Sequence, residues 1–134
     1  MPGRGFINPG TTGCSIFVNH ESPEAVPVID LIGEVDLEAA PKIYSAIWQA
    51  SEYGRNSLVL NLEKLDFMDS SGLQALLRLR EKLRTRKQNI VLAGAKPQIK
   101  KLFRLTGFDK LFPLAKDSTE AVSMSGELSR KKIT

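Results

Sequence analysis

The sequence predicts a single α/β domain with a mixed, mostly parallel sheet of four to five strands and four helices. Two β-prone segments open the chain, and helical and strand patterns alternate after them, as in helices packed on a sheet. The length of 134 residues fits one domain. We expect a flexible arm rich in glycine and proline at residues 1–13, the domain at 14–128, and a basic tail at 129–134.

The first two strands are expected at residues 14–18 and 26–32, joined by a hairpin connection. Both segments are apolar and β-prone, and the residues between them include Pro23 and several turn formers. Pro27 cannot donate a hydrogen bond to a neighbouring strand, which favours a position near a strand start or a sheet edge. Residues 33–36, Gly-Glu-Val-Asp, then break the run.

An amphipathic helix is expected next. Its first turn suits Pro41, because the fixed φ and missing N–H of proline are tolerated there, and Gly54 is a natural end. The apolar residues recur at the spacing of one helical stripe: Ala40, Ile43, Tyr44, Ile47 and Trp48. Residues 58–62, which follow, are almost wholly apolar, as is typical of a buried central strand.

The rest of the chain continues the alternation. Residues 71–87 carry the strongest helical pattern, with leucines on one face and basic residues largely off it. A third buried strand is expected at 90–93, followed by a helix that starts at a proline and ends at a glycine, at 97–107. A short edge strand at 112–114 and a final helix at 118–128 complete the predicted domain.

The composition excludes several kinds of functional site. A single cysteine, Cys14, excludes a disulfide framework, and a single histidine, His20, excludes a two-histidine metal site. We expect Cys14 to be a buried apolar residue and His20 a surface residue without a catalytic partner. Because no apolar run approaches ~20 residues and no signal-peptide pattern is present, we expect a soluble, cytoplasmic protein without cofactor or metal.

The net charge of +4 conceals two oppositely charged parts. Residues 1–77 hold 4 basic and 10 acidic residues, whereas residues 78–110 hold 11 basic and 2 acidic residues. A basic block can bind nucleic acid, but this one contains only Phe103 and Phe108 for base stacking, and Phe103 falls on an apolar helix face. We therefore expect the block to be a solvated or protein-facing surface, with no direct nucleic-acid partner.

The segment with the most functional information is residues 61–74, NLEKLDFMDSSGLQ. Asp69-Ser70-Ser71-Gly72 stands where the leucine-striped helix begins, so its polar side chains can cap the free N–H groups of the first turn. A phosphate on a serine there would meet the positive end of the helix and add about −1.5 to −2 charges. On local sequence alone, plain capping and a modified serine both remain open, and capping is the more common.

The wider pattern resembles the STAS domain, and more narrowly the bacterial anti-sigma factor antagonists. The resemblance rests on Gly-Glu-Val-Asp at 33–36, LVLNLE at 58–63, FMDSSGL at 67–73 and AKPQIKKLFRLTGF at 95–108, and it covers roughly residues 15–122. It implies a STAS fold and a partner switch in transcription regulation. The unphosphorylated protein would bind an anti-sigma factor and free the sigma factor, and the phosphorylated protein would not.

The resemblance also implies the partners and the phosphorylated residue. The anti-sigma factor would be an ATP-dependent serine kinase with a histidine-kinase-like fold, and a metal-dependent serine phosphatase would reverse its action. Matching residue by residue gives Ser70 as the phosphate acceptor. Asp36 and Asp69 match acidic positions near it, and Gly72 would let a partner backbone approach. The residues expected to contact the partner are Gly33, Glu34, Asp36, Asp69, Ser70, Ser71, Gly72 and Gln74.

An enzyme and a scaffold module are the alternatives to a phosphorylation switch. A hydrolase with Ser70 as nucleophile is not expected, because the segment is not Gly-x-Ser-x-Gly and no base accompanies it. The protein is therefore expected not to be an enzyme. The alternative within the same family is a STAS module of a scaffold or sensor complex, which binds protein partners without a phospho-switch.

Overall fold

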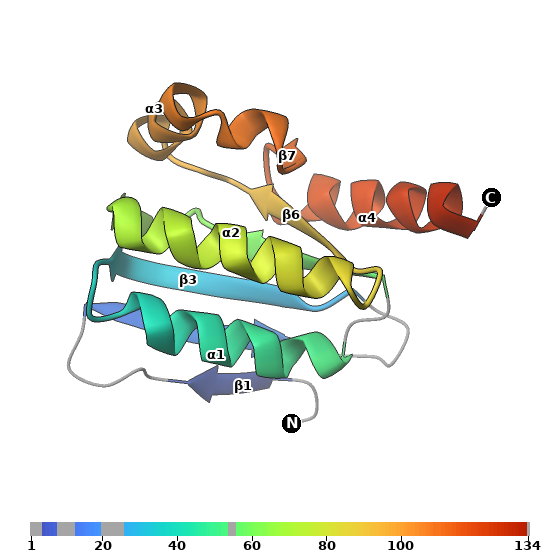
Figure 1. The fold of residues 1–134 in the computed structure, drawn as a ribbon, viewed down its shortest axis with the longest axis horizontal. Coiled ribbons are helices and arrows are strands. Elements are labelled where there is room, and N and C mark those ends of the chain that lie inside the picture. The colour runs from blue at the N-terminus through green and yellow to red at the C-terminus, as the bar shows by residue number, and fades with distance from the viewer. Residues whose placement is uncertain (1–3, 8–12, 20–25, 54–55, 134) are drawn as a thin grey trace.

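The computed structural model describes residues 4–7, 13–19, 26–53 and 56–133 (Figure 1). Expectations that fall on residues 1–3, 8–12, 20–25, 54–55 and 134, including the one for His20, lie outside this part of the chain. The elements in chain order are β1 (Arg4–Ile7), β2 (Cys14–Asn19), β3 (Val28–Val35), α1 (Ala40–Ala50), η1 (Ser51–Tyr53), β4 (Ser57–Asn61), β5 (Leu65–Met68), α2 (Ser70–Arg84), β6 (Asn89–Ala93), α3 (Pro97–Thr106), η2 (Phe108–Lys110), β7 (Leu114–Ala115) and α4 (Ser118–Ile133).

The strands form one mixed sheet in the order β1-β2-β3-β4-β6-β7, with β5 paired to β3 beyond the end of β4. The pairs β1–β2 and β2–β3 are antiparallel, and the four other pairs are parallel. The predicted fold class, an α/β domain with four helices and a mixed, mostly parallel sheet, is therefore confirmed. The described residues contain seven strands rather than four to five.

The two additional strands lie where local composition gives little signal. Strand β1 lies within residues 1–13, which we expected to be a flexible arm, and it pairs with β2 along its whole length. Strand β5 has only two buried residues of four, so it lacks an apolar run. Both strands are defined by pairing with residues distant in sequence, which a local pattern does not report.

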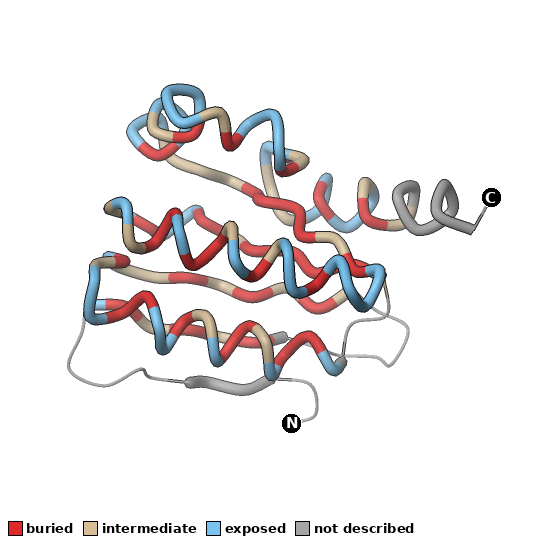
Figure 2. Tube along the Cα trace, in the orientation of Figure 1, coloured by how far each residue is buried: buried red, intermediate tan, exposed pale blue. Residues whose placement is uncertain are grey.

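Helices α1 and α2 lie side by side over one face of the sheet, while α4 packs against β4, β6 and β7 (Figure 1). The larger core fills the space under α1, α2 and α3, and its buried residues follow the strands and the inner sides of the helices (Figure 2). A smaller core lies under α4 and consists of Val59, Val91, Ala93, Ala115 and Ala121. Cys14 is buried in the larger core, as expected.

Several element boundaries differ from the sequence prediction. Strand β3 does not end at residue 32 but continues to Val35, with a register shift between Gly33 and Glu34. The last strand is displaced to Leu114–Ala115, because Phe112 is buried and its ring stacks on Phe108 at 5.3 Å between centroids. Helix α2 begins at Ser70 and ends at Arg84, before Lys87, which has a φ of 60°.

Helix α4 is longer than the final helix that the sequence predicts. It runs to Ile133 and so includes most of the residues that we expected to form a basic tail. None of the helices built from the described residues combines the length and the apolar character that crossing a bilayer requires.

Candidate functional site

Helices α1 and α2 start at neighbouring points on one edge of the sheet. Strands β3 and β5 are parallel and Val35 is paired with Met68, so the chain leaves both strands at the same edge. The N–H of Asp69 donates a hydrogen bond to the Val35 carbonyl at 3.1 Å, which ties the two exits together. Asp36 and Asp69 each follow a member of this pair, so the sheet brings the two predicted acidic residues to one place.

Asp69 is the N-cap of α2, with extended backbone angles (φ −101°, ψ −172°). Its Oδ1 accepts hydrogen bonds from the N–H of Ser71 at 3.0 Å, from the N–H of Gly72 at 3.4 Å, and from the Ser71 hydroxyl. The pKa of Asp69 is lowered, mainly by the Ser71 hydroxyl; desolvation opposes this, and the backbone N–H groups of Gly72 and Ser71 lower the pKa further. The carboxylate is therefore ionised at neutral pH and fixed in position.

The two serines of the predicted site differ in the state of their hydroxyl groups. Ser70 is the first residue of α2 and is exposed, and no hydrogen bond within the described part of the chain involves its hydroxyl. Ser71 is half-buried and its hydroxyl is bound to Asp69. Ser70 is therefore the serine whose hydroxyl is accessible, and Ser71 belongs to the cap.

Asp36 has a structural role of its own at the start of α1. Its Oδ1 accepts a hydrogen bond from the N–H of Ala39 at 3.0 Å, and its carbonyl accepts one from the N–H of Ala40 at 2.9 Å. Asp36 therefore fixes the turn that leads into α1, whose N-cap is Ala39, whereas Asp69 is itself the N-cap of α2.

The turn between Asp36 and α1 also exposes an apolar side chain that the sequence analysis missed. Leu37 is 75% exposed, next to Asp36 and therefore at the same edge as the start of α2. Its signal in the sequence is weak: it is a leucine between two acidic residues, ahead of Pro41 and off the helical stripe. An exposed leucine at this edge gives an otherwise acidic surface an apolar contact point.

Gly72 has a role in the packing of α2. It is buried, and a Cβ at this position would lie 2.6 Å from Cγ of Met68 and 2.8 Å from Cγ1 of Val35. The missing side chain of Gly72 makes room for the protein's own core. The expectation that Gly72 lets a partner backbone approach stays a prediction. The glycine lets the first turn of α2 pack closely on β3 and β5.

Gly33 and Glu34 lie in β3, at its register shift. Gly33 has a φ of +104°, and a Cβ there would lie 1.8 Å from the Gly13 carbonyl oxygen. The N–H of Glu34 donates to that same carbonyl at 3.1 Å, and the Glu34 side chain is exposed. The positive φ and the close Gly13 carbonyl therefore require a glycine at position 33. Glu34 adds an exposed carboxylate near Asp36.

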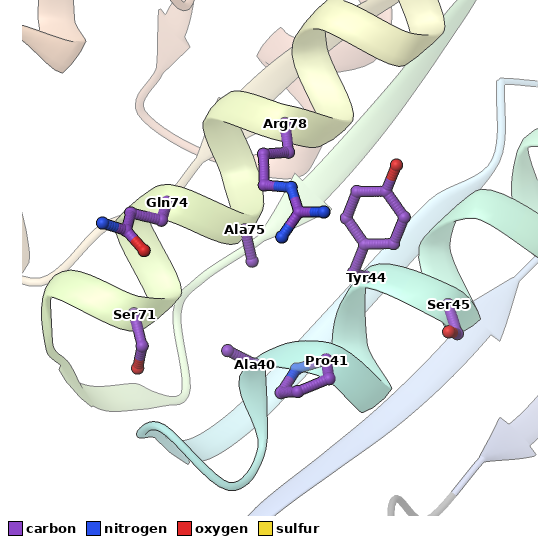
Figure 3. Close-up of a pocket in the computed structure, with 8 residues that line it drawn as sticks. All are labelled: Ala40, Pro41, Tyr44, Ser45, Ser71, Gln74, Ala75 and Arg78. Atoms are coloured by element: carbon purple, nitrogen blue, oxygen red, sulfur yellow. The ribbon is translucent and has the colours of Figure 1, made fainter.

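A groove of about 310 Å³ runs between α1 and α2, beginning beside the Asp69 cap. Figure 3 shows Ser71 at one end of the groove and the guanidinium of Arg78 directed toward the ring of Tyr44. The distance from the Arg78 Cζ to the centre of the Tyr44 ring is 5.6 Å. Of the predicted partner-binding residues, Ser71 and Gln74 line this groove.

The same pattern of basic and aromatic residues continues toward the far end of the two helices. Trp48 of α1 is covered by Arg86, with Cζ 3.7 Å from a ring centre, and by Lys82, with Nζ at 5.3 Å. The basic side chains that the sequence places off the apolar face of α2 therefore include a row that packs on the aromatic residues of α1.

Residues 18–121 match the model of the STAS domain family. The chain is 35% identical over 94 residues to the anti-sigma F factor antagonist of Lysinibacillus sphaericus, over 69% of this chain and 78% of that protein. Its fold is similar to that of an anti-sigma factor antagonist from Mycobacterium paratuberculosis (TM-score 0.73, 28% identity, 84% and 93% coverage). It is also similar to the Bacillus cell fate determinant SpoIIAA in its phosphorylated form (TM-score 0.62, 26% identity, 81% and 97% coverage).

Proposed function

The chain belongs to the STAS domain family, and from this premise we propose that it is an anti-sigma factor antagonist switched by phosphorylation of Ser70. Its relatives form a non-enzymatic family of anti-sigma factor antagonists at about 30% identity. In the proposed cycle the unphosphorylated protein binds an anti-sigma factor, a serine kinase that uses ATP and has a histidine-kinase-like fold, and so frees the sigma factor. Phosphorylation ends this binding, and a metal-dependent serine phosphatase restores it.

The single observation that carries the proposal is the contrast between the two adjacent serines. A kinase needs a hydroxyl that it can reach and that is free to attack a phosphoryl group. Ser70 is exposed and its hydroxyl is outside the cap, whereas the Ser71 hydroxyl is bound to Asp69. A phosphorylated form is known for the similar protein SpoIIAA, which supports the assignment of a phosphorylated residue to this chain.

The charges around Ser70 support the direction of the switch. Asp36 and Asp69 lie at the same sheet edge, and the exposed Glu34 and Glu38 flank Asp36. A phosphate on Ser70 adds about −1.5 to −2 charges to this acidic surface. The positive end of the α2 dipole tolerates a phosphate at the helix start, while a docked partner would face repulsion and desolvation. A loss of only ~3 kcal/mol weakens binding about a hundredfold.

The proposed docking face combines this acidic edge with the groove between α1 and α2. From the predicted set it keeps the residues that are exposed or half-buried and not glycine: Glu34, Asp36, Asp69, Ser70, Ser71 and Gln74. The exposed Leu37 is added as an apolar anchor, because contact surfaces gain most from an apolar side chain surrounded by polar ones. Gly33 and Gly72 support the face from within.

The test is phosphorylation by the cognate anti-sigma kinase with ATP, followed by mass-spectrometric mapping. We expect phosphate on Ser70 of the wild type, none on Ser70→Ala, and wild-type phosphorylation of the matched variant Ser71→Ala. Phosphate on Ser71 would contradict the proposal. A protein that binds its partner yet is never phosphorylated would instead support a scaffold or sensor-complex module.

A further inference from the structure

The basic residues that α2 contributes to the block of residues 78–110 take part in two different sets of contacts. One row, Arg78, Lys82 and Arg86, packs on Tyr44 and Trp48 of α1. Two further arginines on α2, Arg80 and Arg84, line a separate cavity together with the start of β6 and the segment between η2 and β7. This second part of the block has no role in the proposed phospho-switch.

The cavity lies toward the opposite end of α2 from Ser70. Fourteen residues separate Ser70 from Arg84, which corresponds to about 20 Å along a helix. Its volume is about 430 Å³, within the range of small-molecule sites. Its polar lining residues are Arg80, Arg84, Gln88 and Asn89, and its apolar ones are Ile90, Leu111, Phe112 and Pro113. Of the apolar residues, Ile90 and Phe112 are buried, whereas Leu111 is 40% exposed.

Arg80 is held in place by its neighbours. Its Nε donates a hydrogen bond to the Leu111 carbonyl at 3.0 Å, and its Cζ lies 6.0 Å from the centre of the Phe112 ring. Its Nη1 is paired with Glu81 at 3.2 Å, and the side chain is only 24% exposed. This arginine therefore keeps its position without a ligand, which lowers the entropy lost on binding.

Arg84 supplies a charge that is not balanced nearby. It lies one helical turn from Arg80, on the same side of α2, and no ion pair between described residues includes it. None of the described residues that line the cavity carries a carboxylate. The cavity is therefore lined by two arginines and by apolar residues, and Arg84 is the one of these arginines without an ion pair among the described residues.

We propose that this cavity binds a small organic phosphate monoester. The phosphate lies against Arg84 and Arg80, because guanidinium groups match phosphate oxygens in geometry and charge. The organic part lies against Leu111 and Pro113, the apolar lining residues that are not buried. A dianionic phosphate matches two guanidinium groups better than a monoanionic carboxylate does, and the apolar lining residues Leu111 and Pro113 favour an organic ester over inorganic phosphate.

Phenyl phosphate is the probe, and its binding to the full chain is followed by the amide signals in ¹⁵N-¹H NMR spectra. We expect saturable shifts of the Arg84, Asn89 and Leu111 amides, with inorganic phosphate, phenol and benzoate each binding at least tenfold more weakly. Arg84→Gln should weaken phenyl phosphate binding at least tenfold. The matched control Arg104→Gln, an exposed arginine of α3 outside the cavity, should leave it unchanged.

Several results would overturn the proposal. Equal affinity of Arg84→Gln and wild type, or shifts centred on the start of α2, would show that the cavity is not the site. Benzoate binding as tightly as phenyl phosphate would show that phosphate is not the recognised group. Ser70→Ala should bind phenyl phosphate like wild type, so the result is independent of the phospho-switch.

Discussion

The Ser71 hydroxyl donates a hydrogen bond to the Asp69 carboxylate, and this bond separates the two adjacent serines at the start of α2. It assigns Ser71 and Asp69 to the cap and leaves the Ser70 hydroxyl accessible to a partner. The stability of the helix start and the availability of the switch residue therefore depend on different side chains. Predictions about folding and about regulation can be tested separately for this reason.

Replacing Asp69 with Ala removes the cap of α2. We expect a loss of about 1 kcal/mol in the free energy of unfolding, because two N–H groups and a hydroxyl lose their acceptor.

The stabilisation by Asp69 also depends on pH. Since the folded-state pKa of Asp69 lies below its unfolded value, this stabilisation is complete above the unfolded pKa and is lost as pH falls through the folded pKa. Urea unfolding at pH 7 and at pH 2–3 checks both points, with the exposed Glu38→Gln as control. Equal stability of Asp69→Ala and wild type at pH 7 would contradict the cap.

Replacing Ser71 with Ala removes the strongest of the interactions that lower the pKa of Asp69. We therefore expect the pKa of Asp69 to rise toward its usual value, measured by NMR titration of the carboxyl carbon. Ser70→Ala is the matched control and should leave this pKa unchanged, because its hydroxyl is not bound to Asp69. A shift caused by Ser70→Ala and not by Ser71→Ala would show that the two roles are reversed.

Replacing Gly72 with Ala inserts a methyl group into space occupied by Met68 and Val35. We expect a loss of about 1–3 kcal/mol, the usual effect of overpacking a tight core. Gly126→Ala in α4 is the control, because no described atom from beyond its chain neighbours and its own helix backbone lies within 4 Å of the added Cβ. That change should be neutral or stabilising by up to ~1 kcal/mol, as alanine favours a helix. Thermal or urea unfolding measures the change in the free energy of unfolding for both variants.

Replacing Leu37 with Ala tests the apolar anchor of the proposed docking face. Because the side chain is 75% exposed, we expect unchanged stability and affinity for the anti-sigma kinase reduced about tenfold or more. Leu105 of α3, which is 76% exposed and outside the proposed face, gives the matched variant Leu105→Ala. Titration calorimetry measures the affinity of each variant and of the wild type for the kinase. A larger loss of affinity for Leu105→Ala than for Leu37→Ala would place the docking face elsewhere.

Cys14 should be almost inert in the folded protein. Burial is the main cause that raises its pKa to about 11, with a smaller contribution from Asp36, so little thiolate exists at pH 8. We expect a colorimetric thiol reagent to react with it at least a hundredfold more slowly than in guanidinium chloride at the same pH. Reaction of the native protein at the unfolded rate would show that Cys14 is accessible.

The sequence predicts those parts of the fold that local patterns determine. The helical stripe behind Pro41, the leucines of α2 and the glycine at the end of α3 each report a local structure, and all of them are confirmed. Strands β1 and β5 depend on pairing partners far along the chain, so composition alone missed them.

The candidate site shows the same limit. Motif matching locates the Asp69–Gly72 segment, and simple capping rules explain Asp69. The role of Gly72 depends on Met68, which the fold places against it. Leu37 is exposed to solvent, and the basic residues of α2 pack on the rings of α1. Such relationships between elements are not visible in the spacing of residues along one element.

The packing of Arg86 on Trp48 also gives the chain an internal optical reporter. Trp48 is the only tryptophan among the 134 residues, and the contact joins it to the neighbouring helix at 3.7 Å. Its fluorescence emission responds to the nearby guanidinium and to solvent access, so separation of the two helices would change the signal. Docking against these helices can therefore be followed in solution without attaching a dye.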